Sequence, residues 1–181
     1  GSMIPKEVDD LIVAEKSISV SNLMNGATRL QPVVMQLGQA AGALAALACI
    51  EDKGVKEIGV RQVQEKLLDS GCYIMPYLDL PKSDPHFKAL QRIGATGVLR
   101  GEGRNVGWSN ETWFRADEPL RGEEIYASEL YGAITVDPGE ISVGHMLELV
   151  RSYGGRVPYG KMADWWKQLG LNDFDTQRIA T

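Results

Sequence analysis

The residues that most often carry chemistry are few in this sequence, and their spacing argues against several kinds of site. Its only histidines, His86 and His145, lie far apart, and neither has cysteines or carboxylates around it at metal-ligand spacing. No serine stands in the G-x-S-x-G turn of a nucleophilic hydrolase. His86 lies near an expected helix start, where a capping or exposed role is more common than general base catalysis. We therefore expect neither a metal site nor a hydrolase.

The glycines indicate a helix face that another group can approach closely, and their spacing argues against a dinucleotide-binding motif. Gly38 and Gly42 lie four residues apart, so on a helix they share a face that another backbone or a ligand can approach. Tight helix packing alone is the alternative explanation. Gly101, Gly103 and Gly107 lack the G-x-G-x-x-G spacing that holds a dinucleotide pyrophosphate, and no other segment has it.

Composition and charge fit an ordinary globular protein. The 181 residues include 44% hydrophobic and 24% charged side chains, which argues against disorder. Nineteen Lys and Arg against 24 Asp and Glu give a net charge of −5 without a basic run, so we expect no nucleic-acid partner. Two cysteines, Cys49 and Cys72, are too few for a disulfide framework.

The first part of the chain reads as a strand, a polar loop and two helices. Residues 10–14 form a short β-branched run that predicts a buried strand. Residues 32–50 are apolar or small around almost the whole helical circumference, which predicts a helix buried on several sides. A membrane span is the less favoured alternative, because alanine dominates and two glutamines interrupt the run. An amphipathic helix follows from Val60 and stops at Gly71.

The composition changes near residues 74–80, where we place a domain boundary. Asp84 is expected to cap a helix that has Pro85 at its first position. Glycines, asparagines and aromatic residues over 101–117 predict a structured loop or short hairpin. Helical patterns resume at 121–131, 142–153 and 159–169.

Three spaced motifs in the first part resemble one family. These are D-L-I-V-A-E-K-S-I-S at 10–19, R-L-Q-P at 29–32 and L-G-Q-A-A-G at 37–42. Together they resemble the C-terminal end of FAD-dependent oxidoreductases, over roughly residues 4–75. The resemblance implies that the N-terminal amides of the closing helix point toward the flavin, where a positive helix end favours negative charge. It places Arg29, Gln36, Gly38 and Gln39 nearest the cofactor, with Gly38 allowing close approach and Arg29 supplying positive charge.

Two departures limit what this chain is expected to do. Glu15 and Lys16 stand where family members often have Gly-Arg. The dinucleotide fingerprint is also absent, so we expect a missing N-terminal flavin-binding portion to be the main partner. FAD is then the cofactor of the longer parent, and the fragment itself is expected to hold no cofactor and to be inactive.

The second part resembles an S-layer homology repeat. The resemblance rests on Y-L-D at 77–79, a helical segment at 86–94, G-V-L-R-G at 97–101 and T-W-F-R-A-D-E-P from Thr112. Residues 141–181 resemble a degenerate second repeat. The family implies polysaccharide binding, with Trp108, Trp113, Arg115 and Asp117 as candidates for stacking on sugars and bonding hydroxyls. Packing of Trp113 and Phe114 in a small core is the alternative, and residues 104–110 are an insertion relative to the repeat.

We therefore expect a mainly α fold: a short strand plus a buried helix from a flavin-domain end, at 4–75, and an S-layer-homology-like helical module at 77–181. The favoured function is a C-terminal fragment of a FAD-dependent oxidoreductase. The alternative is a polysaccharide- or cell-wall-associated binding module, since similar bacterial chains are sometimes labelled xanthan lyase. A purely structural tail is a third possibility. We also expect an extracytoplasmic bacterial location, no membrane span, and self-association or packing of the apolar helix against the second part.

Overall fold

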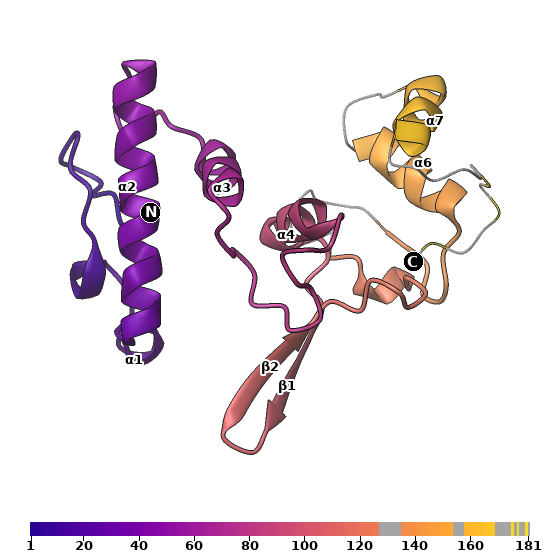
Figure 1. The fold of residues 1–181 in the computed structure, drawn as a ribbon, viewed down its shortest axis with the longest axis horizontal. Coiled ribbons are helices and arrows are strands. Elements are labelled where there is room, and N and C mark those ends of the chain that lie inside the picture. The colour runs from indigo at the N-terminus through magenta and orange to yellow at the C-terminus, as the bar shows by residue number, and fades with distance from the viewer. Residues whose placement is uncertain (127–134, 154–157, 169–174, 176, 178–179, 181) are drawn as a thin grey trace. The chain divides into compact units, whose positions relative to one another are not determined.

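The chain is mainly helical and forms two compact units. The computed structural model describes residues 1–126, 135–153, 158–168, 175, 177 and 180 (Figure 1). Residues Gly1–Ile74 form unit 1 and Met75–Thr181 form unit 2. The expected mainly α class is confirmed, and each unit is described by itself.

Unit 1 is built around one long helix. Its elements are η1 (Glu15–Ser17), α1 (Asn22–Thr28), α2 (Gln31–Glu51) and α3 (Val60–Asp69). In α2, alanine, leucine, methionine and glutamine all favour helix. Pro32 falls in the first turn, where its missing N–H breaks no intrahelical bond. The helix ends at Asp52, whose backbone is left-handed (φ 51°) and whose N–H donates to the Ala48 carbonyl.

The strand expected at residues 10–14 is wrong. Those residues are irregular backbone, bounded by left-handed conformations at Asp10 (φ 54°) and Glu15 (φ 57°). A strand needs a neighbour along its length. In the described part of unit 1 the segment makes one backbone–backbone hydrogen bond, from the Val13 N–H to the Met3 carbonyl (2.8 Å).

The expectation that α2 is buried on several sides is also wrong. One side of α2 packs into a core made with the amino-terminal segment and α3: Leu44, Ala48, Val55 and Ile58, with Ile4, Ile12, Leu47 and Val63 against them. The remaining side is not covered by any described residue of unit 1. The helix carries apolar residues around its circumference, but unit 1 supplies partners for only half of it.

Unit 2 contains helices, a hairpin and irregular segments. Its described elements are α4 (Phe87–Thr96), β1 (Glu102–Val106), β2 (Ser109–Trp113), η2 (Gly122–Glu124), α6 (Val143–Tyr153) and α7 (Tyr159–Gln168). Helix α4 begins at Phe87 rather than at Pro85, because the Asp84 carboxylate accepts the His86 N–H (2.7 Å) in a turn that precedes the helix. It ends at Gly97, which is left-handed (φ 77°).

The predicted hairpin is present as an antiparallel pair. Strand register runs from Glu102 opposite Trp113 to Val106 opposite Ser109, with Gly107 (φ 60°) in the connecting turn. A positive φ at the first residue of a two-residue turn suits the twist of paired strands.

A second apolar cluster lies at the C-terminal end of unit 2. Ile141, Val143 and Ala180 are buried, with Leu120, Ile125, Val136, Met146, Leu147 and Trp166 against them. Of the helices expected here, those at 142–153 and 159–169 correspond to α6 and α7. The helix expected at 121–131 begins instead as η2, and its remainder from residue 127 lies outside the described residues, as do Leu169 and Phe174.

Candidate functional site

The first candidate site is the N-terminal end of α2, where the residues expected near a cofactor lie. Ser21 caps α1 by accepting the Met24 N–H (3.3 Å), and α1 then ends at Arg29. Leu30 is the N-cap of α2, so Arg29 lies one residue before the cap. The first turn of α2 contains no acidic side chain. The positive end of a 21-residue helix and the Arg29 guanidinium therefore lie at one end of the same helix.

Gln36, Gly38 and Gln39 all lie on the uncovered side of α2. This exposed face of α2 consists of eleven residues: Gln31, Pro32, Met35, Gln36, Gly38, Gln39, Gly42, Ala45, Ala46, Cys49 and Ile50. It has no charged side chain. The structure thus brings the three helical candidates to one face and Arg29 to its beginning.

The two glycines of this face open onto free space. A Cβ atom built on Gly38 or Gly42 meets no heavy atom within 4 Å. Their lack of side chains is therefore not required by packing within the described part of unit 1. What it provides is a strip of bare backbone on which another group can lie closely.

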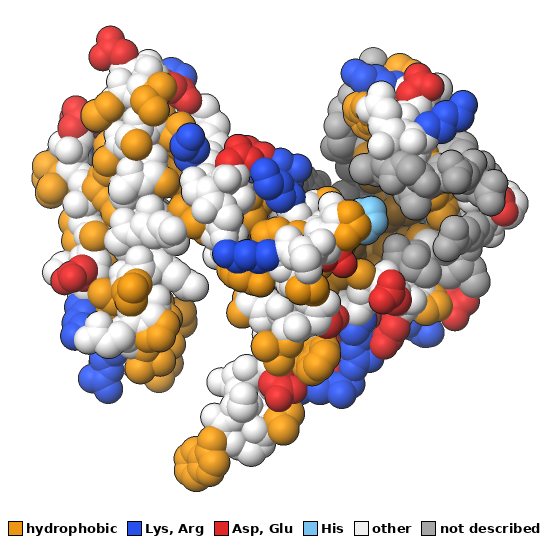
Figure 2. Space-filling view, viewed as in Figure 1, with side chains coloured by type: hydrophobic (Ala, Val, Ile, Leu, Met, Phe, Trp, Pro, Cys, Tyr) orange, Lys and Arg blue, Asp and Glu red, His pale blue; other side chains and the backbone are white. Residues whose placement is uncertain are grey.

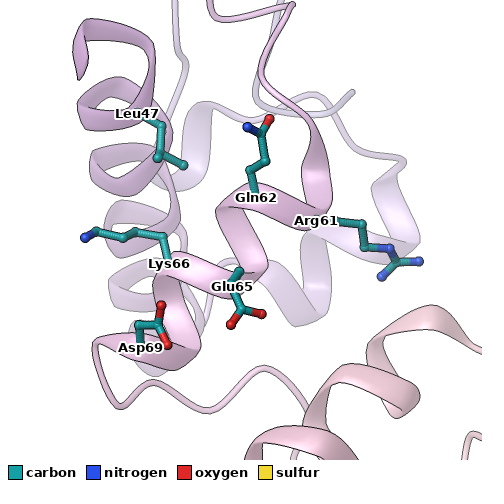
Figure 3. A pocket seen from close by; sticks show the side chains of 6 residues that line it. All are labelled: Leu47, Arg61, Gln62, Glu65, Lys66 and Asp69. Atoms are coloured by element: carbon teal, nitrogen blue, oxygen red, sulfur yellow. The ribbon is translucent and has the colours of Figure 1, made fainter. Parts of the chain in front are cut away.

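A shallow hollow lies on another part of unit 1, between α2 and α3 (Figure 3). Its volume is about 450 Å³, and its lining is Leu47 from α2 with Arg61, Gln62, Glu65, Lys66 and Asp69 from α3. The charged side chains of both signs balance one another. Gln62 is held by neighbours, since it donates to Glu51 (2.9 Å) and accepts the Gly59 N–H (2.8 Å). None of the expected site residues lines this hollow.

The second candidate site, in unit 2, is divided between the two ends of the hairpin. Trp108 lies in the turn and is fully exposed, and Figure 2 shows a hydrophobic side chain at that end. Trp113 closes the opposite end of β2, five residues away, which corresponds to roughly 16 Å along a strand. The structure does not bring these two rings together.

The residues at the hairpin base are tied into structural contacts. Trp113 is half-buried and its indole N–H donates to Glu111 (3.2 Å). Arg115 pairs with Glu102 (2.6 Å) and with Glu118 (3.2 Å). Asp117 is exposed. Phe114 packs edge-on against Tyr77, with ring centroids 5.1 Å apart, so the packing explanation fits this end of the hairpin better than sugar binding.

Two polar residues that organise unit 2 were not among the expected site residues. The Asp79 carboxylate accepts the backbone N–H groups of Phe114 (2.9 Å) and Arg115 (2.7 Å). Gln91 is fully buried and exchanges two hydrogen bonds with the Met75 backbone, at 2.7 and 2.9 Å. Asp79 belongs to the Y-L-D motif, which could have signalled its role, whereas Gln91 has no local signature.

One phenol of this region has a strongly shifted pKa. Burial, together with the negative charge of Asp79, raises the pKa of Tyr77 to about 12. Its hydroxyl donates to the Arg100 carbonyl at 3.4 Å. Tyr77 is therefore a protonated packing group at neutral pH and not a candidate base.

Histidine and cysteine side chains form no site in the described part of the chain. His86 and His145 are both exposed, and among the described residues no three His, Cys, Asp or Glu side chains are grouped to hold a metal. Cys49 is exposed and Cys72 is buried, and both are free thiols.

Comparison with known proteins supports the interpretation of the first part of the chain. Residues 1–67 match the family described as FAD dependent oxidoreductase. This stretch includes α1, α2 and most of α3, and it confirms that the amino-terminal region is like that of FAD-dependent oxidoreductases. No curated protein and no solved structure matches the chain.

Proposed function

We propose that this chain is the C-terminal part of a FAD-dependent oxidoreductase and that it is inactive without a flavin-binding portion. The observation that carries the proposal is the exposed N-terminal half of α2. It lies within the region that matches the family, and it presents Gln36, Gly38 and Gln39 on a side that unit 1 leaves uncovered, with Arg29 just before the start of the helix.

The donor set at this end of α2 fits the ring edge of a flavin but not its pyrophosphate. The glutamine amides can donate and accept hydrogen bonds, Arg29 is a permanent cation, and Gly38 leaves room above the helix. No G-x-G-x-x-G turn is present to bind phosphates. FAD, when bound, supplies hydride or electron transfer. This chain's contribution is to close one side of the site, exclude water there and place positive charge beside the cofactor.

The test is the flavin content of the protein produced with the residues that precede it in its natural gene. We expect the longer protein to retain FAD through purification. The 181-residue chain, mixed with FAD and purified again, should retain none. In the longer protein, Arg29→Ala and Gln39→Ala should each lower flavin retention or shift the flavin absorbance. Gln168→Ala, on an exposed position of α7, should change neither. A longer protein that binds no flavin would refute the proposal.

The exposed hairpin turn favours a second candidate function, binding to a neutral polysaccharide. The six residues 105–110 carry no charge, and the Trp108 ring lies in the turn, beyond the paired asparagines at 105 and 110. An indole face can stack on the C–H face of a sugar while amides bond its hydroxyl groups. A protein partner is less well suited, because the six-residue tip of the hairpin offers far less than the roughly 800 Å² per partner of a standard interface.

Affinity electrophoresis through gels that contain soluble polysaccharides tests this function. We expect Trp108→Ala to abolish retardation by a polysaccharide that retards the unaltered chain. Trp165→Ala is the matched control, because Trp165 is another exposed tryptophan (43% exposed) that lies on α7. Equal loss in both variants, or no retardation by any neutral glucan or mannan gel, would rule the function out.

A further inference from the structure

We propose that a neutral, linear polysaccharide lies along one face of the hairpin formed by β1 and β2, and that this face holds a run of several sugars. The inference rests on the second candidate function, which concerns the tip of the hairpin around Trp108. It adds the face that the ligand follows and the residues that hold the ligand there.

The strand register divides the hairpin into two faces. Residues directly opposite one another lie on the same face, and successive residues along a strand alternate between the faces. The amide face consists of two opposed pairs, which are Asn105 with Asn110 and Gly103 with Thr112. The charged face consists of the other three pairs, which are Glu102 with Trp113, Arg104 with Glu111, and Val106 with Ser109.

The two faces differ in charge and in how far their side chains are already engaged. On the charged face both carboxylates accept hydrogen bonds, one from Arg104 (2.6 Å) and the other from the Trp113 indole (3.2 Å). The amide face has no charged group. Asn105 and Asn110 are exposed, and within the described part of the chain their amides have no hydrogen-bond partner. These amides are therefore available to a ligand.

Three residues of the amide face are poorly suited to the strands that they occupy. Asparagine and glycine are depleted from strands, and nothing in the structure requires glycine at 103. Its backbone is not left-handed, and an added Cβ would meet no heavy atom within 4 Å. Residues that break a local rule without a structural reason are expected at functional sites, and glycine within a strand often marks the close approach of a ligand. All three lie on the amide face.

The amide face offers a continuous strip of hydrogen-bonding groups. The Cβ atoms of an opposed pair lie about 4.5–5.5 Å apart, so the two asparagine amides can bond neighbouring hydroxyl groups of one sugar. Thr112 follows Trp108 by four residues, roughly 13 Å along an extended strand, which is longer than one sugar ring. Open space over Gly103 leaves the strip unobstructed. The strip therefore suits an oligosaccharide better than a monosaccharide.

The strip is fixed in place before any ligand binds. At the end of the hairpin far from the turn, the Leu78 N–H donates to the Thr112 carbonyl (2.9 Å), and the Asp79 carboxylate accepts the N–H groups of Phe114 and Arg115. Figure 1 shows the two strands extending from this end as an arm of unit 2. A site that is already ordered loses less conformational entropy on binding than a loop that must fold around its ligand.

Two other kinds of ligand are less well matched to this face. A nucleic acid or an acidic polysaccharide requires cations, and the amide face has none. A peptide that adds as a third strand beside β1 would bond to the backbone. Such a peptide gives no reason for asparagine and glycine to gather on one face.

Affinity electrophoresis of the 181-residue chain through gels that contain hydroxyethyl cellulose or glucomannan, both neutral, tests the assignment. Asn105→Val/Asn110→Val removes both amides while raising strand propensity. We expect this variant to bind at least about tenfold more weakly, because two or more hydrogen bonds are lost. Arg104→Gln/Glu111→Gln is the matched control, since it alters the adjacent opposed pair on the charged face and keeps the net charge. Its affinity should be unchanged.

Competition by free sugars tests the length of the site on the unaltered chain. A hexasaccharide cut from the retarding polymer should release the chain at a lower concentration than the corresponding monosaccharide. Equal competition by the two sugars overturns the proposal of an extended ligand. This measurement needs no variant, so it decides the question even where a substitution prevents folding.

Circular dichroism establishes that the variants are folded. A folded asparagine double variant that is retarded as strongly as the unaltered chain overturns the face assignment, and so does equal weakening in the control variant. In either case, retardation of the unaltered chain that Trp108→Ala abolishes would still support the polysaccharide function. Absence of retardation by both gels refutes that function and this inference together.

Discussion

Single polar side chains hold unit 2 together where regular structure is sparse. Gln91 lies on α4 with no exposed surface, and its amide bonds both backbone groups of Met75. In this way one side chain replaces a strand partner for a loop residue. Such a role depends on residues sixteen positions apart in the sequence, and no local spacing rule predicts it.

Gln91→Ala should destabilise unit 2 by about 2 kcal/mol or more, because it leaves a buried N–H and a buried carbonyl of Met75 without their partner. Urea denaturation followed by circular dichroism measures the loss. Gln168→Ala removes the same side chain from an exposed helical position and should change stability by less than about 0.5 kcal/mol. Equal effects of the two substitutions would mean that the contact between Gln91 and Met75 contributes nothing to the stability of unit 2.

Glu123 makes the stability of unit 2 sensitive to acid. The Gly139 N–H, followed by the Arg121 guanidinium, holds the pKa of the Glu123 carboxyl at about 2, against 4.5 for an ordinary glutamate. The carboxylate therefore contributes stability above pH 4.5, and this contribution is lost as the pH falls toward 2. Scanning calorimetry should show a falling Tm across this window. In Glu123→Gln the fall should be shallower, and an identical pH profile would contradict the assignment.

At the scale of elements, periodicity predicted the helices well and exposure poorly. The apolar run at 32–50 and the pattern from Val60 became α2 and α3 because alanine, leucine and glutamine favour helix whatever surrounds them. The strand at 10–14 failed because β-structure depends on a partner that the described part of unit 1 does not supply. The missing flavin-binding portion predicted that the apolar helix would expose a patch, and α2 does so. Which side is exposed could not be predicted, since an apolar residue looks the same in the sequence whether or not something covers it.

The two sides of α2 should respond differently to truncation. Leu44→Ala, on the packed side, should cost about 2 to 5 kcal/mol, as expected when a buried leucine (6% exposed) is lost from a core. Met35→Ala, on the exposed face, removes a side chain that is 75% exposed and should be nearly neutral. Thermal melts at a concentration low enough to keep the chain monomeric make the comparison. A large loss in Met35→Ala would show that the face is covered in the monomer.

At the scale of the whole molecule, the chain consists of two units with separate apolar clusters. The composition change near residues 74–80 was visible because prolines become frequent there, whereas the placement of candidate site residues was not visible. Trp108 and Trp113 are close in sequence but lie at opposite ends of a hairpin, since an extended strand separates residues that a turn would bring together.

We expect the two units to unfold in separate transitions, because the described clusters are each built within one unit. Differential scanning calorimetry should resolve two components. Leu44→Ala should lower the Tm of only one component, which is thereby assigned to unit 1. Gln91→Ala should lower the Tm of only the other component, which belongs to unit 2. A single transition that both substitutions shift together would show that the units are energetically coupled.

The tryptophans at 108, 113, 165 and 166 all belong to unit 2, and the indole at 108 lies entirely in water. Under selective excitation the intrinsic emission of the chain is therefore blind to unit 1, and its red edge comes largely from the hairpin turn. Any molecule that covers this turn will shift that emission to the blue, so the chain contains its own optical reporter and needs no attached dye.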